Sequence, residues 1–140
     1  MKWRCNRLNW GGVLLLASAF GLWQAGWSDR SIFTLQGTEE AYWLDIMRPT
    51  WVEALGVSAG AALGWVLGHA LTSFGAPLVL VERLVPGARG RPLLGRLGLA
   101  VVGVLFGLAS VMVHVEVGKT YRPIPTLAQY AAVAVGVLVL

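Results

Sequence analysis

The stretch LGLAVVGVLFGLASVMVHVEV, residues 97–117, contains a single charged side chain, that of Glu116. As an α-helix it covers about 30 Å, which is the thickness of the hydrocarbon core of a bilayer. A segment this long and this apolar predicts a membrane-spanning helix.

The composition of the whole chain agrees with that interpretation. Of the 140 residues, 56% are hydrophobic and 13% are charged, and the mean hydropathy is +0.67. Soluble domains carry about 25% charged residues. A small domain leaves much of its surface exposed, so water could not accommodate this much apolar area, whereas lipid can.

Three further apolar runs accompany the first one. We expect an all-α integral membrane protein with four transmembrane helices in a single membrane domain, residues 1–140. The other expected spans are residues 8–27, 51–73 and 126–140. Ala17-Ser18-Ala19 also resembles a signal-peptidase site, which leaves a cleaved signal peptide open as an alternative. The last run covers only about 22 Å as a helix, so whether it crosses completely is left open.

Polar segments separate these runs. Residues 28–50 read as an interfacial loop with a short amphipathic helix over 38–47, closed by Pro49. Gly75 and Pro77 offer a break after the second span, so the residues that follow form either a cytoplasmic extension or a kinked continuation of the helix. Residues 82–96 form a turn-rich basic loop.

The distribution of basic residues predicts the orientation. The N-terminal segment and the 82–96 loop together hold seven of the eleven Lys and Arg residues. Cytoplasmic loops carry the Lys/Arg excess, so both termini should be cytoplasmic in a bacterial inner membrane. The net charge of +4 is spread between apolar runs, so we expect lipid headgroups as partners and no nucleic acid.

Glycines recur at every fourth position of the second run. A glycine stripe lets another helix approach closely in lipid, so we predict glycine-rich close packing with another membrane helix. The partner can be a helix of this chain, a second copy or another subunit. The predicted helix-packing stripe comprises Gly56, Gly60, Gly64 and Gly68, with Gly103 and Gly107 on the third run. The first run has small residues at the same four-residue spacing, Ala17, Gly21 and Ala25.

Ionisable residues near the outer ends of the spans form a candidate polar or ion site: Glu53, His114 and Glu116. The competing interpretation is ordinary interfacial charge. His69 is expected near the opposite end of its span, most of a bilayer away from His114, which argues against a haem held by both. The sequence has no nucleophile elbow, phosphate loop, zinc helix or Cys-x-x-Cys pair, so we expect no catalytic residues, no metal and no cofactor.

One family resemblance extends over residues 50–140. Ala54-Leu55-Gly56-Val57, Ala62-Leu63-Gly64, Glu116-Val117-Gly118 and Gly136-Val137-Leu138 are similar to sporulation membrane proteins of the YtrH type. The resemblance implies a small helical membrane protein that serves endospore formation and has no enzymatic activity. The first 45 residues would be an addition to that family pattern.

The leading functional hypothesis is therefore a non-enzymatic packing or assembly subunit of a membrane complex, in sporulation if the resemblance holds. One alternative is a small oligomeric channel or transporter. Another is a cofactor-bearing redox or pigment-binding subunit, which would show an absorption band after purification.

Overall fold

A computed structural model describes residues 10–35, 41–85, 87, 94–120 and 124–140. This part of the chain is mostly helical, which confirms the predicted helical class, with one short β-hairpin. The elements in chain order are α1 (Trp10–Trp23), η1 (Gln24–Ser28), η2 (Ser31–Phe33), α2 (Ala41–Met47), η3 (Arg48–Thr50), β1 (Trp51–Val52), β2 (Val57–Ser58), α3 (Ala59–Gly68), η4 (His69–Gly75), α4 (Ala76–Leu84), α5 (Arg96–Thr120) and α6 (Leu127–Val139).

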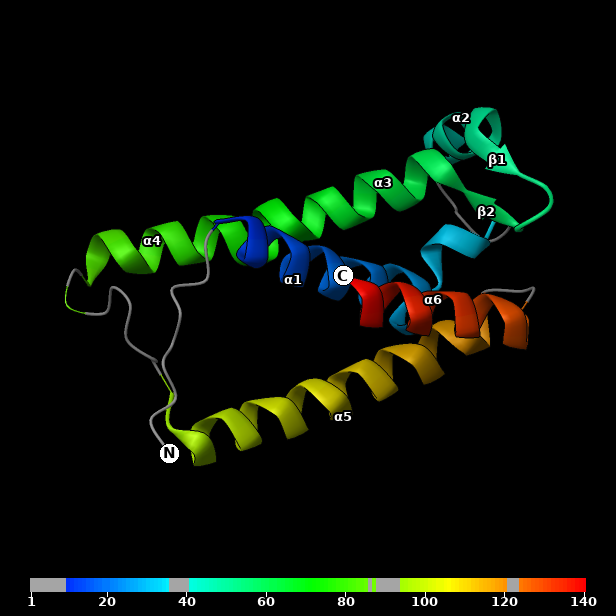
Figure 1. Ribbon diagram of the computed structural model, residues 1–140. Coiled ribbons are helices and arrows are strands. Elements are labelled where there is room, and N and C mark those ends of the chain that lie inside the picture. The colour runs from blue at the N-terminus through cyan, green and yellow to red at the C-terminus, as the bar shows by residue number, and fades with distance from the viewer. Residues whose placement is uncertain (1–9, 36–40, 86, 88–93, 121–123) are drawn as a thin grey trace.

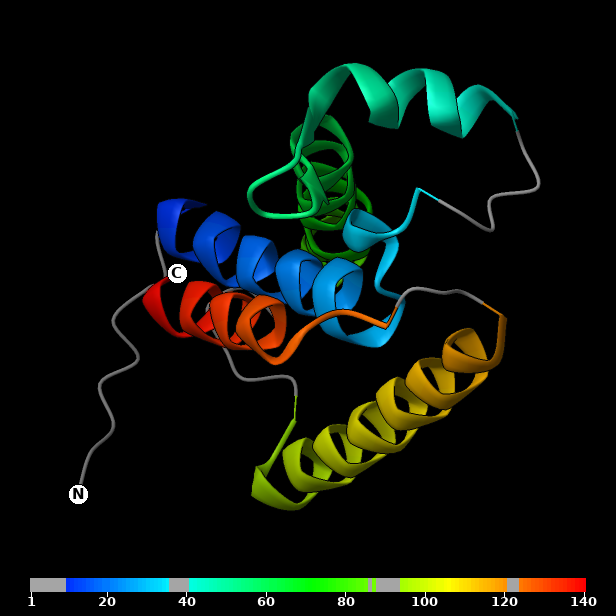
Figure 2. The same cartoon turned by 90° about the vertical axis from the view of Figure 1, so that its right-hand side faces the viewer.

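Helix α1 lies at the centre of the molecule. It packs against α3 and η4 on one side and against α6 on the other (Figures 1 and 2). Small residues make this possible, since Ala17 is fully buried and a Cβ built on Gly21 would lie 2.9 Å from Cα of Val66. The close approach of α1 to α3 therefore depends on the small side chains of α1.

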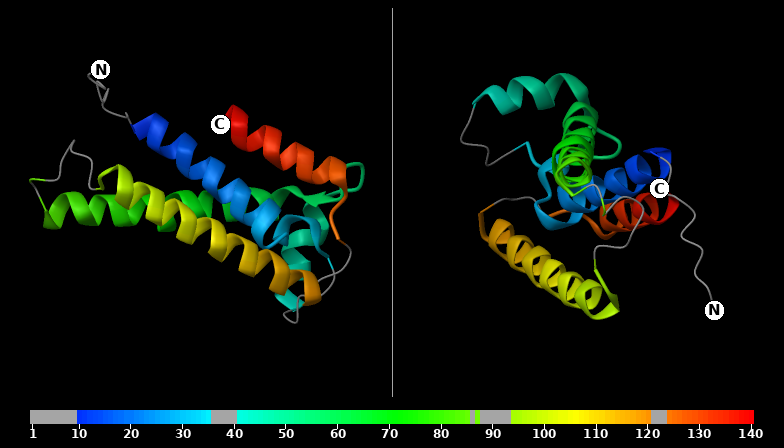
Figure 3. Two further views of the ribbon diagram at one scale, coloured as in Figure 1. Left: turned by 90° about the horizontal axis from the view of Figure 1, so that it is seen from below. Right: turned by 90° about the vertical axis from the view of Figure 1, so that its left-hand side faces the viewer.

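Consecutive long helices run in opposite directions. Helices α1 and α5 point one way, and the continuous helix α3–η4–α4 and helix α6 point the other way (Figures 1 and 3). The turn 29–35, the hairpin and the start of α6 consequently gather at one end of the molecule.

Helix α5 stands apart from the other helices over much of its length. It packs mainly against η1, and it diverges from α4 toward its own N-terminal end (Figures 1 and 2). Of the α5 side chains whose burial is described, only Ser110 is buried. An apolar cavity of about 350 Å³ opens beside Phe106 of α5, lined also by Leu16, Ala19, Phe20, Trp23, Phe74 and Val137.

The second long helix begins later than predicted. Residues 51–58 form an antiparallel hairpin in which Trp51 pairs with Ser58 and Val52 with Val57. Gly56 lies in its turn with φ +59°, a conformation that favours glycine. Ser58 then caps α3 by accepting a hydrogen bond from the Ala61 backbone N–H. The expected span over 51–73 is thus wrong at its start, because a hairpin was hidden in a continuous apolar run.

The same helix also ends later than predicted. It passes Gly75 and Pro77 and continues to Leu84, and the π-helical segment η4 ends at Gly75, two residues before the proline. Proline lacks a backbone N–H and crowds the carbonyl four residues earlier, so a wider helical turn relieves the conflict. The basic loop predicted over 82–96 is therefore shorter, since Glu82–Leu84 belong to α4 and Arg96 begins α5. Residues 86 and 88–93 of that loop lie outside the described residues.

The remaining boundaries fall close to the predictions. The helix expected over 8–27 is observed as Trp10–Ser28, and that over 97–117 as Arg96–Thr120. The helix expected over 126–140 is Leu127–Val139, capped by a reciprocal pair of hydrogen bonds between Thr126 and Gln129. Among the described residues, two helices are long and apolar enough to cross a membrane, by length and composition: Ala59–Leu84 and Arg96–Lys119.

Candidate functional site

The turn after η1 carries a basic side chain into the protein. Arg30 is only 6% exposed and has φ 61°, which is uncommon for a residue other than glycine. Ile32 and Phe33, two and three residues after Arg30, are buried in the hydrophobic core beside Val133 of α6. Burial of these two apolar side chains draws the turn back against the helices, and Arg30 is drawn in with them.

The Arg30 guanidinium joins the turn to α5. Its Nη2 donates to Nε2 of His114 at 2.6 Å and to the His114 backbone carbonyl at 3.2 Å. Nδ1 of His114 lies 2.6 Å from the carbonyl oxygen of Trp27. A carbonyl can only accept and a guanidinium can only donate, so these partners fix a neutral imidazole with its proton on Nδ1. The imidazole also stacks on the Trp27 indole, with ring centroids 4.5 Å apart.

Several polar atoms around this contact are buried without a hydrogen-bond partner in the described part of the chain. Two of them, Nε and Nη1, belong to Arg30 itself. The hydroxyls of Ser28, Ser110 and Tyr130 are likewise buried without a hydrogen-bond partner among the described residues. The Tyr130 ring lies 6.0 Å from the His114 ring, and Ser110 precedes His114 by one turn on the same face of α5. A polar centre therefore lies between η1, α5 and α6.

Gly118 provides room for the guanidinium. A Cβ built on Gly118 would lie 3.1 Å from Nη1 and 3.2 Å from Nη2 of Arg30. Gly118 follows His114 by four residues, so both lie on the face of α5 that meets the turn.

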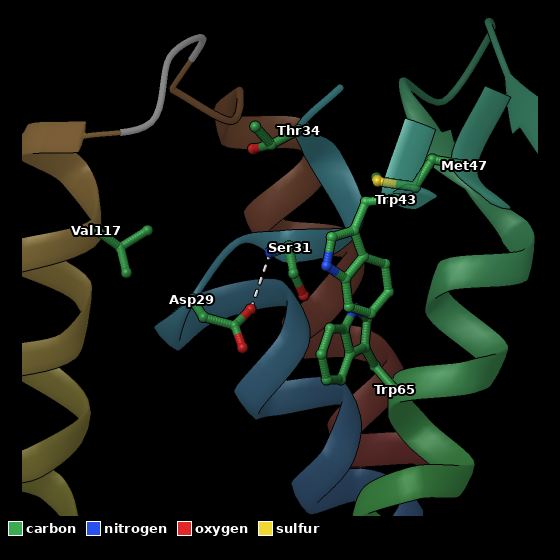
Figure 4. Close-up of a pocket in the computed structure, with 7 residues that line it drawn as sticks. All are labelled: Asp29, Ser31, Thr34, Trp43, Met47, Trp65 and Val117. Atoms are coloured by element: carbon green, nitrogen blue, oxygen red, sulfur yellow. Dashed lines mark hydrogen bonds between the residues drawn. The ribbon is translucent and has the colours of Figure 1, made fainter. Parts of the chain in front are cut away.

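A cavity of about 300 Å³ opens on the other side of the turn (Figure 4). It is lined by Asp29, Ser31, Thr34, Trp43, Met47, Trp65 and Val117. The indoles of Trp43 and Trp65 stack on each other with centroids 5.1 Å apart, and in Figure 4 they form one wall of the cavity opposite Val117. Helix α2, the turn, α3 and α5 thus each contribute to the lining.

Asp29 is the acidic group of this cavity. One of its carboxylate oxygens accepts a hydrogen bond from the Ser31 backbone N–H at 2.9 Å. Burial raises the pKa of Asp29 above its ordinary value, and the hydrogen bonds from Ser31 oppose that rise. No ion pair involves Asp29 within the described ranges. A weaker coulombic attraction to His69 also lowers the pKa, but burial outweighs these effects, so the charged form of Asp29 is only partly compensated by the protein.

The three residues of the predicted polar or ion site lie in different surroundings. His114 points inward to Arg30, whereas Glu116, two positions on, is exposed and pairs with Lys119 at 2.7 Å. Glu53 is exposed in the turn of the hairpin. No hydrogen bond or ion pair joins Glu53 to either of the others among the residues described.

His69 also lies closer to His114 than predicted. His69 packs against Phe20 and His114 against Trp27, seven residues further along the α1–η1 helix. That corresponds to about 10 Å along the helix axis, instead of most of a bilayer. The error follows from the misplaced start of the second helix.

The six glycines of the predicted stripe also differ in their surroundings. Gly56 is not in a helix at all, because it occupies the hairpin turn. A Cβ built on Gly60 would meet Oγ1 of Thr50 at 2.7 Å. Within the described ranges, no atom lies within 4 Å of a Cβ built on the other four glycines, which are Gly64, Gly68, Gly103 and Gly107. These four positions therefore make no close helix contact with the described part of the chain.

Sequence reasoning missed Asp29, Arg30 and the two stacked indoles. It assigned residues 28–50 to an interfacial loop because of their charges and their Tyr and Trp side chains. The contrary signal was Ile32-Phe33, an apolar pair separated from the charged pair by Ser31 alone, which indicates a turn that folds back onto the core.

Comparison with known proteins identifies no relative of this chain. No protein-family model, no curated protein and no solved structure matches the chain.

Proposed function

We propose that this chain is an integral membrane protein with four membrane-crossing helices and both termini on the cytoplasmic side of a bacterial inner membrane. Its two longest helices are largely covered with exposed apolar side chains, for which lipid is the favourable surrounding. The alternation of helix directions is compatible with repeated crossing (Figure 1).

Within that membrane the protein acts as a non-enzymatic assembly subunit, which binds another membrane helix through the outer face of α3. The observation that carries this proposal is the open surface at Gly64 and Gly68, where a built Cβ meets nothing within 4 Å. Exposed leucines flank the two glycines, with Leu63 62% and Leu67 48% exposed. Small residues at such a position allow close backbone contact between helices in lipid. The resemblance to sporulation membrane proteins of the YtrH type makes a spore-forming complex the first context to examine.

The test compares the mass of the full-length protein in mild detergent for the wild type, Gly64→Leu and Gly68→Leu. We expect the leucines to abolish self-association or capture of the partner and not to lower the unfolding temperature of the single chain, because the space around both positions is open and leucine favours a helix more than glycine does. Gly60→Leu is unsuitable, since it would collide with Thr50 inside the chain.

Ala131→Leu serves as the matched control. Ala131 is exposed on α6 and the substitution adds similar bulk away from the α3 surface. Association that survives both α3 substitutions, or a wild type that stays monomeric with no copurifying protein, would contradict the proposal.

A second candidate function is a small channel or transporter. It is favoured by the buried Arg30–His114 contact, because ionisable groups inside membrane proteins commonly line solute pathways. Flux into liposomes that changes with His114→Gln, and not with the exposed Glu53→Gln, would support it. Equal flux in all three proteins would exclude that pathway.

A further inference from the structure

The cavity beside Asp29 has the properties of a small-ligand site. Its volume of about 300 Å³ lies at the lower end of the range for small-molecule pockets in proteins, about 300–1,000 Å³. Most of its lining is apolar, with two indoles and the Met47 thioether. Such a wall favours a ligand with a compact hydrocarbon or aromatic body.

The charged side chains around the cavity determine which ligand charge it favours. Among the described residues, Asp29 is the charged side chain in its lining, and no Lys, Arg or His side chain of these residues is part of that lining. The neighbouring Arg30 directs its guanidinium to His114 and Gly118, toward α5 and away from the indole wall. The polar groups that accompany Asp29 are the hydroxyl-bearing residues Ser31 and Thr34 (Figure 4).

This arrangement would favour the binding of a cation. A buried carboxylate without a cationic partner is unfavourable, and a positive charge within a few ångströms offsets that cost. Aromatic rings attract organic cations as well, through the negative potential of their π systems. An anion would instead meet an acid and, within the described part of the lining, no basic group.

We propose that this cavity binds a small organic ammonium ion, with Asp29 as the counter-ion and the stacked indoles of Trp43 and Trp65 as the apolar wall. The cavity lies within one chain, so this binding does not depend on the helix association proposed above. Failure of either proposal leaves the other intact.

The experiment uses the full-length protein in detergent and follows calorimetric binding of three probes of similar shape. Benzyltrimethylammonium is cationic, benzyl alcohol is neutral and benzoate is anionic. We expect the ammonium probe to bind most tightly. Empty micelles provide the baseline for partitioning of each probe.

Two variants test separately how the Asp29 charge and the aromatic wall contribute to binding. Asp29→Asn should weaken binding of the ammonium probe about tenfold or more and should change binding of benzyl alcohol little. Trp43→Leu should weaken binding of both probes. Glu53→Gln removes the same charge from the exposed hairpin and should leave both affinities unchanged.

Thermal unfolding of each variant without ligand shows whether the fold is retained. If Asp29→Asn does not fold, the probe series on the wild-type protein still decides the matter, because charge preference is measured there directly. Benzoate binding as tightly as the ammonium probe, or an Asp29→Asn variant with undiminished ammonium affinity, would overturn the proposal.

Discussion

The contact between α1 and α3 can be tested by adding one methyl group at Gly21. A Cβ there would lie 2.9 Å from Cα and 3.0 Å from the carbonyl oxygen of Val66, and 3.2 Å from Cβ of His69. The first two atoms belong to the backbone, so no side-chain rotation relieves the collision. Gly21→Ala must therefore push the two helices apart.

The magnitude follows from two opposing terms. Overpacking of a well-packed contact costs about 1–3 kcal/mol. Replacing glycine by alanine within a helix contributes about 1 kcal/mol in the favourable direction. Gly21→Ala should therefore range from neutral to about 2 kcal/mol destabilising.

A matched control isolates the steric term. A Cβ on Gly107 of α5 meets nothing within 4 Å, so Gly107→Ala gains the same helix propensity without a collision. The difference between the two variants should be about 1–3 kcal/mol, with Gly21→Ala the less stable. Reversible unfolding in a mixed-detergent titration measures both. Two variants of equal stability would refute the close approach of α1 to α3.

Three further substitutions test the polar end of the molecule. A raised pKa means that the fold favours the protonated Asp29 carboxyl, so its stabilising contribution is full below the unfolded value of 3.8 and is lost as the pH rises through the folded pKa. Asp29→Asn should consequently unfold at a higher temperature than the wild type near neutral pH, and the two melting curves should converge below pH 3.8; a constant difference at all pH values would argue against the burial of this carboxyl. His114→Phe keeps a ring beside Trp27 and the backbone carbonyl at this position, but it removes the imidazole acceptor for Arg30, which should cost about 2–3 kcal/mol in chemical unfolding. His69→Phe, whose Nδ1 bonds only the exposed Ser73 hydroxyl at 3.1 Å, should cost clearly less, and equal losses would contradict the assigned Arg30 contact. Thr126→Ala removes the N-terminal cap of α6 and should lower stability by about 1 kcal/mol, an effect that Thr72→Ala, whose hydroxyl bonds a carbonyl within its own helix, should not reproduce.

The helices were predictable where apolar length alone determines them. Residues 97–117 were expected to be helical and lie within α5, and the start of α6 at Leu127 follows from a capping threonine that is visible in the sequence. The hairpin over 51–58 was not predictable in this way, because its residues continue the apolar run of the following helix. Gly56 fits a four-residue glycine spacing and a turn equally well.

The candidate site was the least predictable part. His114 was identified as a candidate, but its partners Arg30 and the Trp27 carbonyl lie more than eighty residues away in the sequence. Charge patterning places Asp29 and Arg30 in a loop and carries no information on which loops fold inward. Only the packing of Ile32 and Phe33 decides that, and it depends on tertiary contacts with α6.

The π-helical segment η4 limits how far the open surface on α3 extends. In an α-helix each residue advances by about 100°, so a wider turn shifts the angular phase of every residue after it. Ala76 follows Gly68 by eight residues and so keeps the four-residue spacing in the sequence. Because of η4 it nevertheless no longer lies on the line of Gly64 and Gly68. Because the hairpin precedes α3 and η4 follows it, the line of small residues is only about one and a half helical turns long. A partner helix would consequently touch α3 near a single crossing point, at a steep angle of about −40° as in other small-residue pairs, and would splay away on both sides.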